Sequence, residues 1–368
     1  MSIFFPFIIL SIFSYFISLS YKISLSRSYI IVSFLLVYFY LLFGKFGLLD
    51  FVNQFYRVTA ICLTVFLIFK KKIITENFKQ IFLLFIIYLI LIFICKDLYI
   101  YKYDDFSEYG ITTKLIFYEN NLPSNIDYLQ KGSHHKINFI SYFHYFFLKN
   151  SNQEFYESTT FLAHSFLIIL LINVILSFLQ TTTLKKIIIG IIIYFIIYIL
   201  GPGFDRLYAD SILGLCIALS LLVFFRKTPD KSDKLLLFIF ICSMPMIKPN
   251  GLILILGLVV IFTFFSLVEK KIFLTCIVIL AVLSNFYISK FYMYKFQNLN
   301  KDKDQHYEIH HTNAFTINSL GQANNFINFK GLPNDKYKFF KVQVYELFNN
   351  GIYHSKTFLV LNKVLKNL

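Results

Sequence analysis

The chain has 368 residues, of which 57% are hydrophobic, 20% aromatic and only 15% charged, and its mean hydropathy is +0.66. Soluble domains carry roughly 25% charged residues, so this composition excludes an ordinary soluble protein. Uncharged runs such as 3–19 and 187–200 approach the roughly 20 apolar residues that cross a bilayer as a helix. The sequence therefore predicts an all-α polytopic membrane protein whose first partner is the lipid bilayer.

The net charge of +15 is unevenly distributed along the chain. Short connectors between the apolar runs hold fourteen lysines and arginines against four acids, whereas the segment 96–157 holds six bases and eight acids. Short basic loops mark the cytoplasmic side of a membrane protein. The charge is thus a topology signal, and we expect no nucleic acid among the partners.

Apolar length and the basic connectors together predict about ten transmembrane helices within a domain spanning 1–289. In chain order they cover 3–20, 28–44, 55–69, 80–95, 158–179, 186–201, 208–225, 235–248, 250–268 and 272–289. The third is the weakest, because Asn53, Gln54 and Arg57 crowd its start. Helical spans, as opposed to barrel strands, place the protein in the plasma (inner) membrane.

Alternation of the helices places two polar segments on the extracytoplasmic side. The first is the loop 96–157, where the stretch 137–148 predicts an amphipathic helix lying on the membrane surface. The second is a small C-terminal non-membrane segment, 290–368. It contains turn signals such as Asn-Gly at 350–351.

The outer loop contains an acidic block, with adjacent carboxylates at Asp104 and Asp105 and a third at Glu108. Neighbouring carboxylates at a membrane edge suit a divalent cation such as Mg²⁺ or Mn²⁺, or a general base. The alternative is a solvated loop with ordinary acids.

A second polar group precedes and opens the predicted helix 208–225, where Arg206, Tyr208 and Asp210 stand close together. An acid inside a membrane helix is costly and is usually paired, hydrated or functional. Asp210 fits equally well as an N-terminal acid favoured by the helix dipole. Two histidines in helical stretches near the outer side, His144 and His164, are interpreted as packing residues.

The third candidate is Lys248, in the segment Ile247-Lys248-Pro249-Asn250-Gly251. The apolar stretch 235–268 is too long for one crossing and short for two, so these residues predict a broken or tightly turned helix pair. Freed backbone N–H groups and an ammonium there suit an anionic group such as a phosphate. The alternative is a simple hairpin with a lysine that reaches to the interface.

Three blocks in this order resemble the GT-C superfamily of integral membrane glycosyltransferases, which includes protein-mannosyl and aminoarabinose transferases. The first is Asp104-Asp105-Phe106-Ser107-Glu108-Tyr109-Gly110, the second Tyr208-Ala209-Asp210-Ser211-Ile212-Leu213-Gly214, and the third Lys248-Pro249-Asn250-Gly251-Leu252. The resemblance covers roughly residues 80–290. Tyr103 and Tyr109 stand where tryptophan is common in the family.

The resemblance implies a polyprenyl-phosphate-linked sugar as donor, a glycan, lipid or protein as acceptor, and transfer on the extracytoplasmic side. By this likeness Asp104 is the catalytic base or a metal-binding carboxylate, and Asp105 is its acidic neighbour. Asp210 is a second acid of the cleft, and Lys248 contacts the lipid-linked phosphate. Glu108, Arg206 and Tyr208 are further substrate-binding candidates.

Other functions remain open at this point. Family members continue with more helices beyond the segment matching 290–345, so a truncated or non-catalytic member of the same fold is one alternative. A surface-polysaccharide transporter or assembly protein is another. A transporter places charged residues near the bilayer midplane, and the interiors of the predicted helices from 158 onward are nearly free of them.

Overall fold

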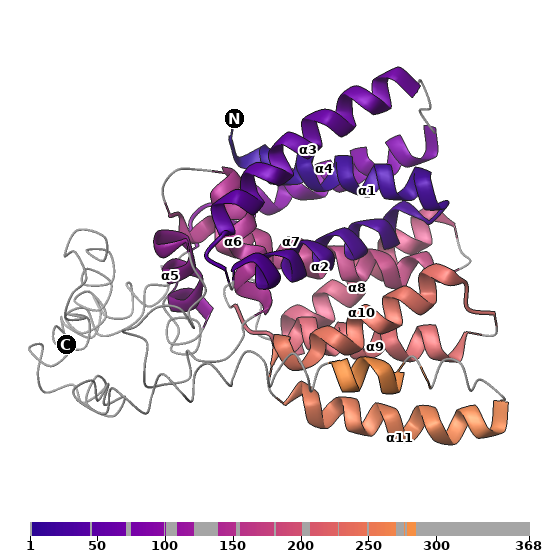
Figure 1. The fold of residues 1–368 in the computed structure, drawn as a ribbon. Helices are drawn as coiled ribbons and strands as arrows, with labels where there is room; N and C mark the ends of the chain where they lie inside the picture. The colour runs from indigo at the N-terminus through magenta and orange to yellow at the C-terminus, as the bar shows by residue number, and fades with distance from the viewer. Residues whose placement is uncertain are drawn as a thin grey trace, which may run out of the picture.

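The computed structural model describes residues 2–44, 46–70, 75–98, 100, 109–120, 139–151, 155–179, 182–200, 207–226, 228–248, 250–269, 276 and 278–284. These residues form helices, with no strand among them. The helices run side by side as one bundle, with α5 and α6 at one end (Figure 1).

After a short 3-10 helix, η1 (Ser2–Phe4), the first four helices form pairs joined by brief connectors. They are α1 (Phe5–Tyr21), α2 (Leu25–Gly44), α3 (Leu49–Lys70) and α4 (Thr75–Cys95). The α1–α2 connector is tight because Lys22 adopts the left-handed conformation and its N–H bonds to the carbonyl of Ser18. Gly47, with a φ of 72°, supplies the same left-handed conformation between α2 and α3.

Two short helices then precede the second half of the bundle. They are α5 (Ile111–Glu119) and α6 (Phe139–Ser151). The remaining helices are α7 (Glu157–Ser177), α8 (Thr183–Leu200), α9 (Asp210–Phe225), α10 (Lys231–Ile247) and α11 (Gly251–Glu269). All but the last of the predicted ranges coincide with one of these helices. The last, 272–289, lies largely outside the described residues, as does the predicted segment 290–368.

Four helices of the described chain are long and apolar enough to cross a membrane, namely Leu25–Gly44, Leu49–Phe69, Asn77–Cys95 and Glu157–Ser177. Shorter apolar helices are Phe5–Tyr21, Asp210–Phe225 and Gly251–Phe265. These helices support a membrane protein, and the number of ten crossings stays a prediction.

Helices α2 and α7 lie inside the bundle, whereas α3 and α4 lie on its surface. In the first two, 78% of the apolar window is buried, against 22% in the other two. The outer helices expose large side chains such as Phe69, Phe93 and Phe195, at 82%, 71% and 59%. Exposed apolar surface on this scale is costly in water and suits the hydrocarbon of a bilayer.

The prediction of a surface helix over 137–148 is wrong in its location. Helix α6 covers most of that stretch, but twelve of its thirteen residues are buried, and it packs against α7, α5, α2 and α1. Its polar side chains Ser141, His144 and Asn150 are buried together with the apolar ones, so neighbouring helices cover the face that a surface helix turns to water. The partly exposed Lys149 is the one residue of α6 that is not buried.

Helix α3 keeps its crowded polar start because these side chains have partners inside the protein. The amide of Asn53 lies between the hydroxyls of Tyr40 and Tyr145. Arg57 donates its Nε–H to Asn150 Oδ1 at 2.8 Å. Paired polar groups avoid the penalty of burial without a hydrogen bond, so the third predicted helix begins earlier, at Leu49.

One end of the bundle, here called the basic end, gathers connectors that are distant in sequence. Arg27 of α2 contacts Asp230 before α10 at 2.7 Å. Phe178, after α7, packs under the guanidinium groups of both Arg27 and Arg226, at 4.8 and 5.8 Å. Several predicted cytoplasmic connectors thus lie at the same end, as the alternation requires.

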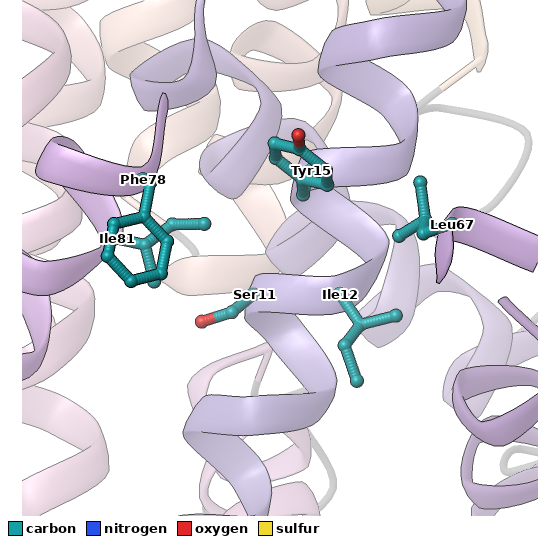
Figure 2. Close-up of a pocket in the computed structure, with 6 residues that line it drawn as sticks. All are labelled: Ser11, Ile12, Tyr15, Leu67, Phe78 and Ile81. Carbon is teal, nitrogen blue, oxygen red and sulfur yellow. The ribbon is translucent and has the colours of Figure 1, made fainter. Parts of the chain in front are cut away.

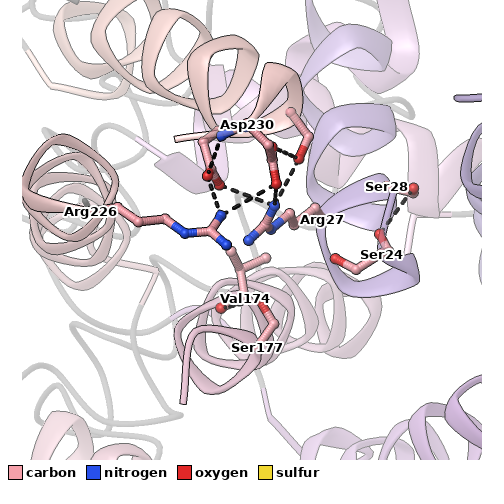
Figure 3. Close-up of polar contacts among 9 residues, drawn as sticks. Ser24, Arg27, Ser28, Val174, Ser177, Arg226 and Asp230 are labelled. Atoms are coloured by element: carbon pink, nitrogen blue, oxygen red, sulfur yellow. Dashed lines mark hydrogen bonds and ion pairs between the residues drawn. The ribbon is translucent and has the colours of Figure 1, made fainter. Parts of the chain in front are cut away.

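An ion cluster closes the basic end (Figure 3). Asp230 caps α10 in a reciprocal arrangement with Asp233, each carboxylate accepting the backbone N–H of the other. Arg27 lies 3.1 Å from the fully buried Asp233, and Arg226 pairs with both acids. Burial alone would raise the pKa of Asp230. Hydrogen bonds, of which the one from Ser232 has the largest effect, nevertheless hold this pKa below its usual range.

Candidate functional site

The predicted site residues divide into two groups. Tyr208, Asp210 and Lys248 lie in the described part of the chain, whereas Asp104, Asp105, Glu108 and Arg206 lie outside the described residues. The roles predicted for the second group therefore stay predictions.

The structure brings Asp210 and Lys248 into direct contact. The ammonium of Lys248 donates to Asp210 Oδ1 at 2.7 Å, although the two residues are 38 positions apart. The side chain of Lys248 is 32% exposed and that of Asp210 is 56% exposed. An accessible ion pair at the end of two packed helices can meet a charged ligand, because an ammonium has three donors and Asp210 occupies one.

A sharp turn between α10 and α11 positions Lys248. Helix α10 ends at Ile247, and the N–H of Gly251 bonds to the carbonyl of Lys248 at 2.8 Å. A Cβ atom on Gly251 would collide with the carbonyl of Met244, so only glycine permits this approach. The predicted tightly turned helix pair is confirmed.

The ends of the acidic segment 101–108 are held by residues of α5, α6 and α7. Before it, the N–H of Ile100 donates to Glu157 Oε2 at 2.6 Å. After it, the carbonyl of Tyr109 accepts from Thr113 Oγ1 at 2.8 Å and from Ser141 Oγ at 3.4 Å. These contacts tie the first block to the core of the bundle.

Two buried histidines connect this anchor to the second block. Thr113 lies 3.5 Å from His144 Nδ1, the rings of His144 and His164 are 5.6 Å apart between centroids, and His164 hydrogen-bonds to the backbone of Tyr208. Burial, and secondarily His164, lowers the pKa of His144. Both histidines are buried, which agrees with their interpretation as packing residues, and their rings pack against each other between the two blocks without a described hydrogen bond from ring to ring.

Lys114 is a residue that the sequence analysis missed. Its side chain on α5 is 2% exposed, and its Nζ lies 5.3 Å from the ring centroid of Phe155. Burial lowers its pKa to about 7, against the opposing charge of Glu157. A lysine followed by the apolar run Leu115-Ile116-Phe117, four positions after Gly110, was the available signal. Perturbed titratable groups of this kind concentrate at functional sites.

No group of three or more histidine, cysteine, aspartate or glutamate side chains able to hold a metal ion occurs within the described ranges. The carboxylates predicted as ligands, Asp104 and Asp105, are outside those ranges. The Mg²⁺ or Mn²⁺ suggested for them stays a prediction.

Comparison with known proteins returned no match among protein-family models, curated proteins or solved structures.

Proposed function

We propose that the protein is a membrane glycosyltransferase that moves a sugar from a polyprenyl-phosphate donor to an acceptor hydroxyl on the extracytoplasmic side of the plasma membrane. The proposal rests first on the resemblance of the three sequence blocks to the GT-C superfamily. The observation that supports it best is the 2.7 Å contact between Asp210 and Lys248, which joins the second and third blocks.

The anchoring contacts give further support. Tyr109 of the first block bonds to Thr113, which lies beside His144, and the ring of His144 packs against that of His164, the neighbour of the Tyr208 backbone in the second block. Residues from three separate parts of the sequence therefore converge at the end of the bundle opposite the basic end. Because basic connectors mark the cytoplasmic side, we assign this convergent end to the outside.

The chemistry follows from these residue types. A carboxylate, Asp104 by the resemblance, takes the proton of the acceptor hydroxyl as its oxygen attacks the anomeric carbon of the sugar. The bond between that carbon and the phosphate oxygen breaks, and the electron pair leaves with the polyprenyl phosphate. Lys248 stabilises the negative charge that develops on the departing phosphate, while Asp210 fixes the position of its ammonium.

The test is sugar transfer by the full-length protein in liposomes supplied with radiolabelled polyprenyl-phosphate sugars. Asp104→Asn should abolish transfer. Lys248→Met should lower it about a hundredfold, the scale for loss of one electrostatic donor to a transition state. Lys96→Met is the control for the loss of a lysine charge, because Lys96 is an exposed lysine that follows α4, outside the three blocks.

A wild-type protein that inserts and purifies as a single species yet transfers no sugar from any donor would overturn the proposal. It would favour the non-catalytic or truncated alternative. Transfer that survives Asp104→Asn would refute the assigned base. Equal losses in Lys248→Met and Lys96→Met would refute the role of Lys248.

A further inference from the structure

An open groove of about 210 Å³ lies on the outside of the bundle between α1, α3 and α4 (Figure 2). Its lining is contributed by Ser11, Ile12, Tyr15, Leu67, Phe78 and Ile81. A water molecule occupies about 30 Å³ in the liquid, so the groove has room for several methylene groups of a chain.

The groove offers apolar contact. The one small polar side chain in its lining, Ser11, is engaged within the protein: its hydroxyl donates to the carbonyl of Phe7 at 2.7 Å and accepts from Tyr29 at 2.6 Å. The adjacent helices α3 and α4 belong to the exposed, lipid-facing part of the bundle, and Phe78 itself is 62% exposed. A hydrocarbon chain is the occupant that this environment supplies.

A lysine follows the helix that contributes half of the groove lining. Ser11, Tyr15 and Ser18 recur every three or four residues and so share one face of α1. The exposed Lys22 comes directly after the last residue of this helix, at the basic end. There Asn77, on the same face of α4 as Ile81, donates to Ser18 Oγ at 3.4 Å and draws the two helix ends together.

From this arrangement we infer a binding site for one anionic phospholipid, with an acyl chain in the groove and the phosphate beside Lys22. Charge complementarity selects the headgroup, because Lys79, which lies on α4 between the lining residues Phe78 and Ile81, is exposed as Lys22 is. Clusters of lysine at a membrane interface bind anionic lipid headgroups. The site is at the opposite end from Lys248 and does not depend on the proposed activity.

The experiment measures phospholipid retained by the full-length protein after exchange into a neutral detergent, by native mass spectrometry. Phosphatidylglycerol and phosphatidylcholine of equal chain length are titrated in turn. The wild type should bind one phosphatidylglycerol in preference to phosphatidylcholine. Lys22→Glu should weaken phosphatidylglycerol at least fivefold, the effect of about one interfacial lysine, and spare phosphatidylcholine.

Two matched controls separate the site from general surface effects. Lys185→Glu makes the same charge change on an exposed lysine of α8 and should leave binding unchanged. Ile81→Trp fills the groove and should weaken both lipids, whereas Ile90→Trp, at a 53% exposed position of α4, should weaken neither.

Three results would overturn the inference. They are equal binding of the two phospholipids by the wild type, equal effects of Lys22→Glu and Lys185→Glu, and displacement of phosphatidylglycerol by polyprenyl phosphate at equal concentration. The last would make the groove an isoprenoid site. Both lysine variants alter exposed side chains and should therefore fold as the wild type does. The native mass spectra that measure lipid binding also verify their folding.

Discussion

Replacement of Asp233 by asparagine tests the ion cluster at the basic end. The change keeps the size of the side chain and removes the charge that faces Arg27 and Arg226. Asp233 is 0% exposed and Arg27 is 7% exposed, so the guanidinium loses a buried partner. Breaking a buried pair by removing one partner costs roughly 3–5 kcal/mol.

Two features of the cluster place the cost near the lower limit, at about 3 kcal/mol. Asp230 remains 2.7 Å from Arg27 and compensates part of the lost charge. The side chain of Arg226 is 37% exposed, so water screens its interaction with Asp233. That interaction contributes about 1 kcal/mol or less to stability. Asp230→Asn is the matched control: its side chain is 50% exposed and asparagine caps a helix as well as aspartate, so it should cost about 1 kcal/mol.

The assay uses the cysteines, because the chain has no tryptophan. Cys95, Cys216 and Cys242 are buried in the folded protein and react with a thiol-specific dye when it unfolds in detergent. The surface cysteines Cys62 and Cys276 are replaced by serine, so that only the buried thiols report unfolding. If Asp233→Asn lowers the free energy of unfolding no more than Asp230→Asn, the reasoning from burial is refuted.

Three further predictions use the same measurement or amide exchange. Gly251→Ala should destabilise the protein, since the added methyl group collides with the backbone of α10, whereas Gly257→Ala, with open space around its Cβ, should stabilise it by about 0.5–1 kcal/mol. The pKa of Lys114 is about 7 in the folded protein and about 10.4 in the unfolded protein. At a pH between these two values, Lys114 is protonated in the unfolded state and largely deprotonated in the folded state. Stability should then rise with pH across that window by up to about 1.4 kcal/mol per pH unit, a slope that Lys114→Met should remove. Glu157→Gln weakens the acceptor of the Ile100 N–H, and hydrogen exchange at that amide should become faster; an unchanged rate would contradict the anchoring role.

Sequence predicted the helices well because apolar length and basic connectors are local signals. It failed for α6, which was predicted to lie on the membrane surface, because its polar side chains Ser141, His144 and Asn150 are buried in the bundle as well. The difference between a helix on a membrane and a helix inside a bundle depends on what covers it. Here α7 and α2 cover it, and no local pattern in 139–151 encodes their presence.

The candidate site was predictable to a similar degree. Asp210 and Lys248 stand out because charge is rare in apolar segments, and the structure places them in contact. Lys114 and Glu157 did not stand out, since the loop around them already contains many charges. Only the tertiary fold removes the Lys114 side chain from solvent and thereby lowers its pKa.

The two ends of the bundle use charge in opposite ways. At the basic end, the buried carboxylate of Asp233 pairs with both Arg27 and Arg226. These ion pairs stabilise the connectors, but they leave the three charged groups little capacity to bind a ligand. At the other end, Lys248 has a single described carboxylate partner and a side chain that is 32% exposed. Its two remaining donors are available to an anion. Binding of a phosphate should therefore be sought at Lys248, and resistance to unfolding at Asp233.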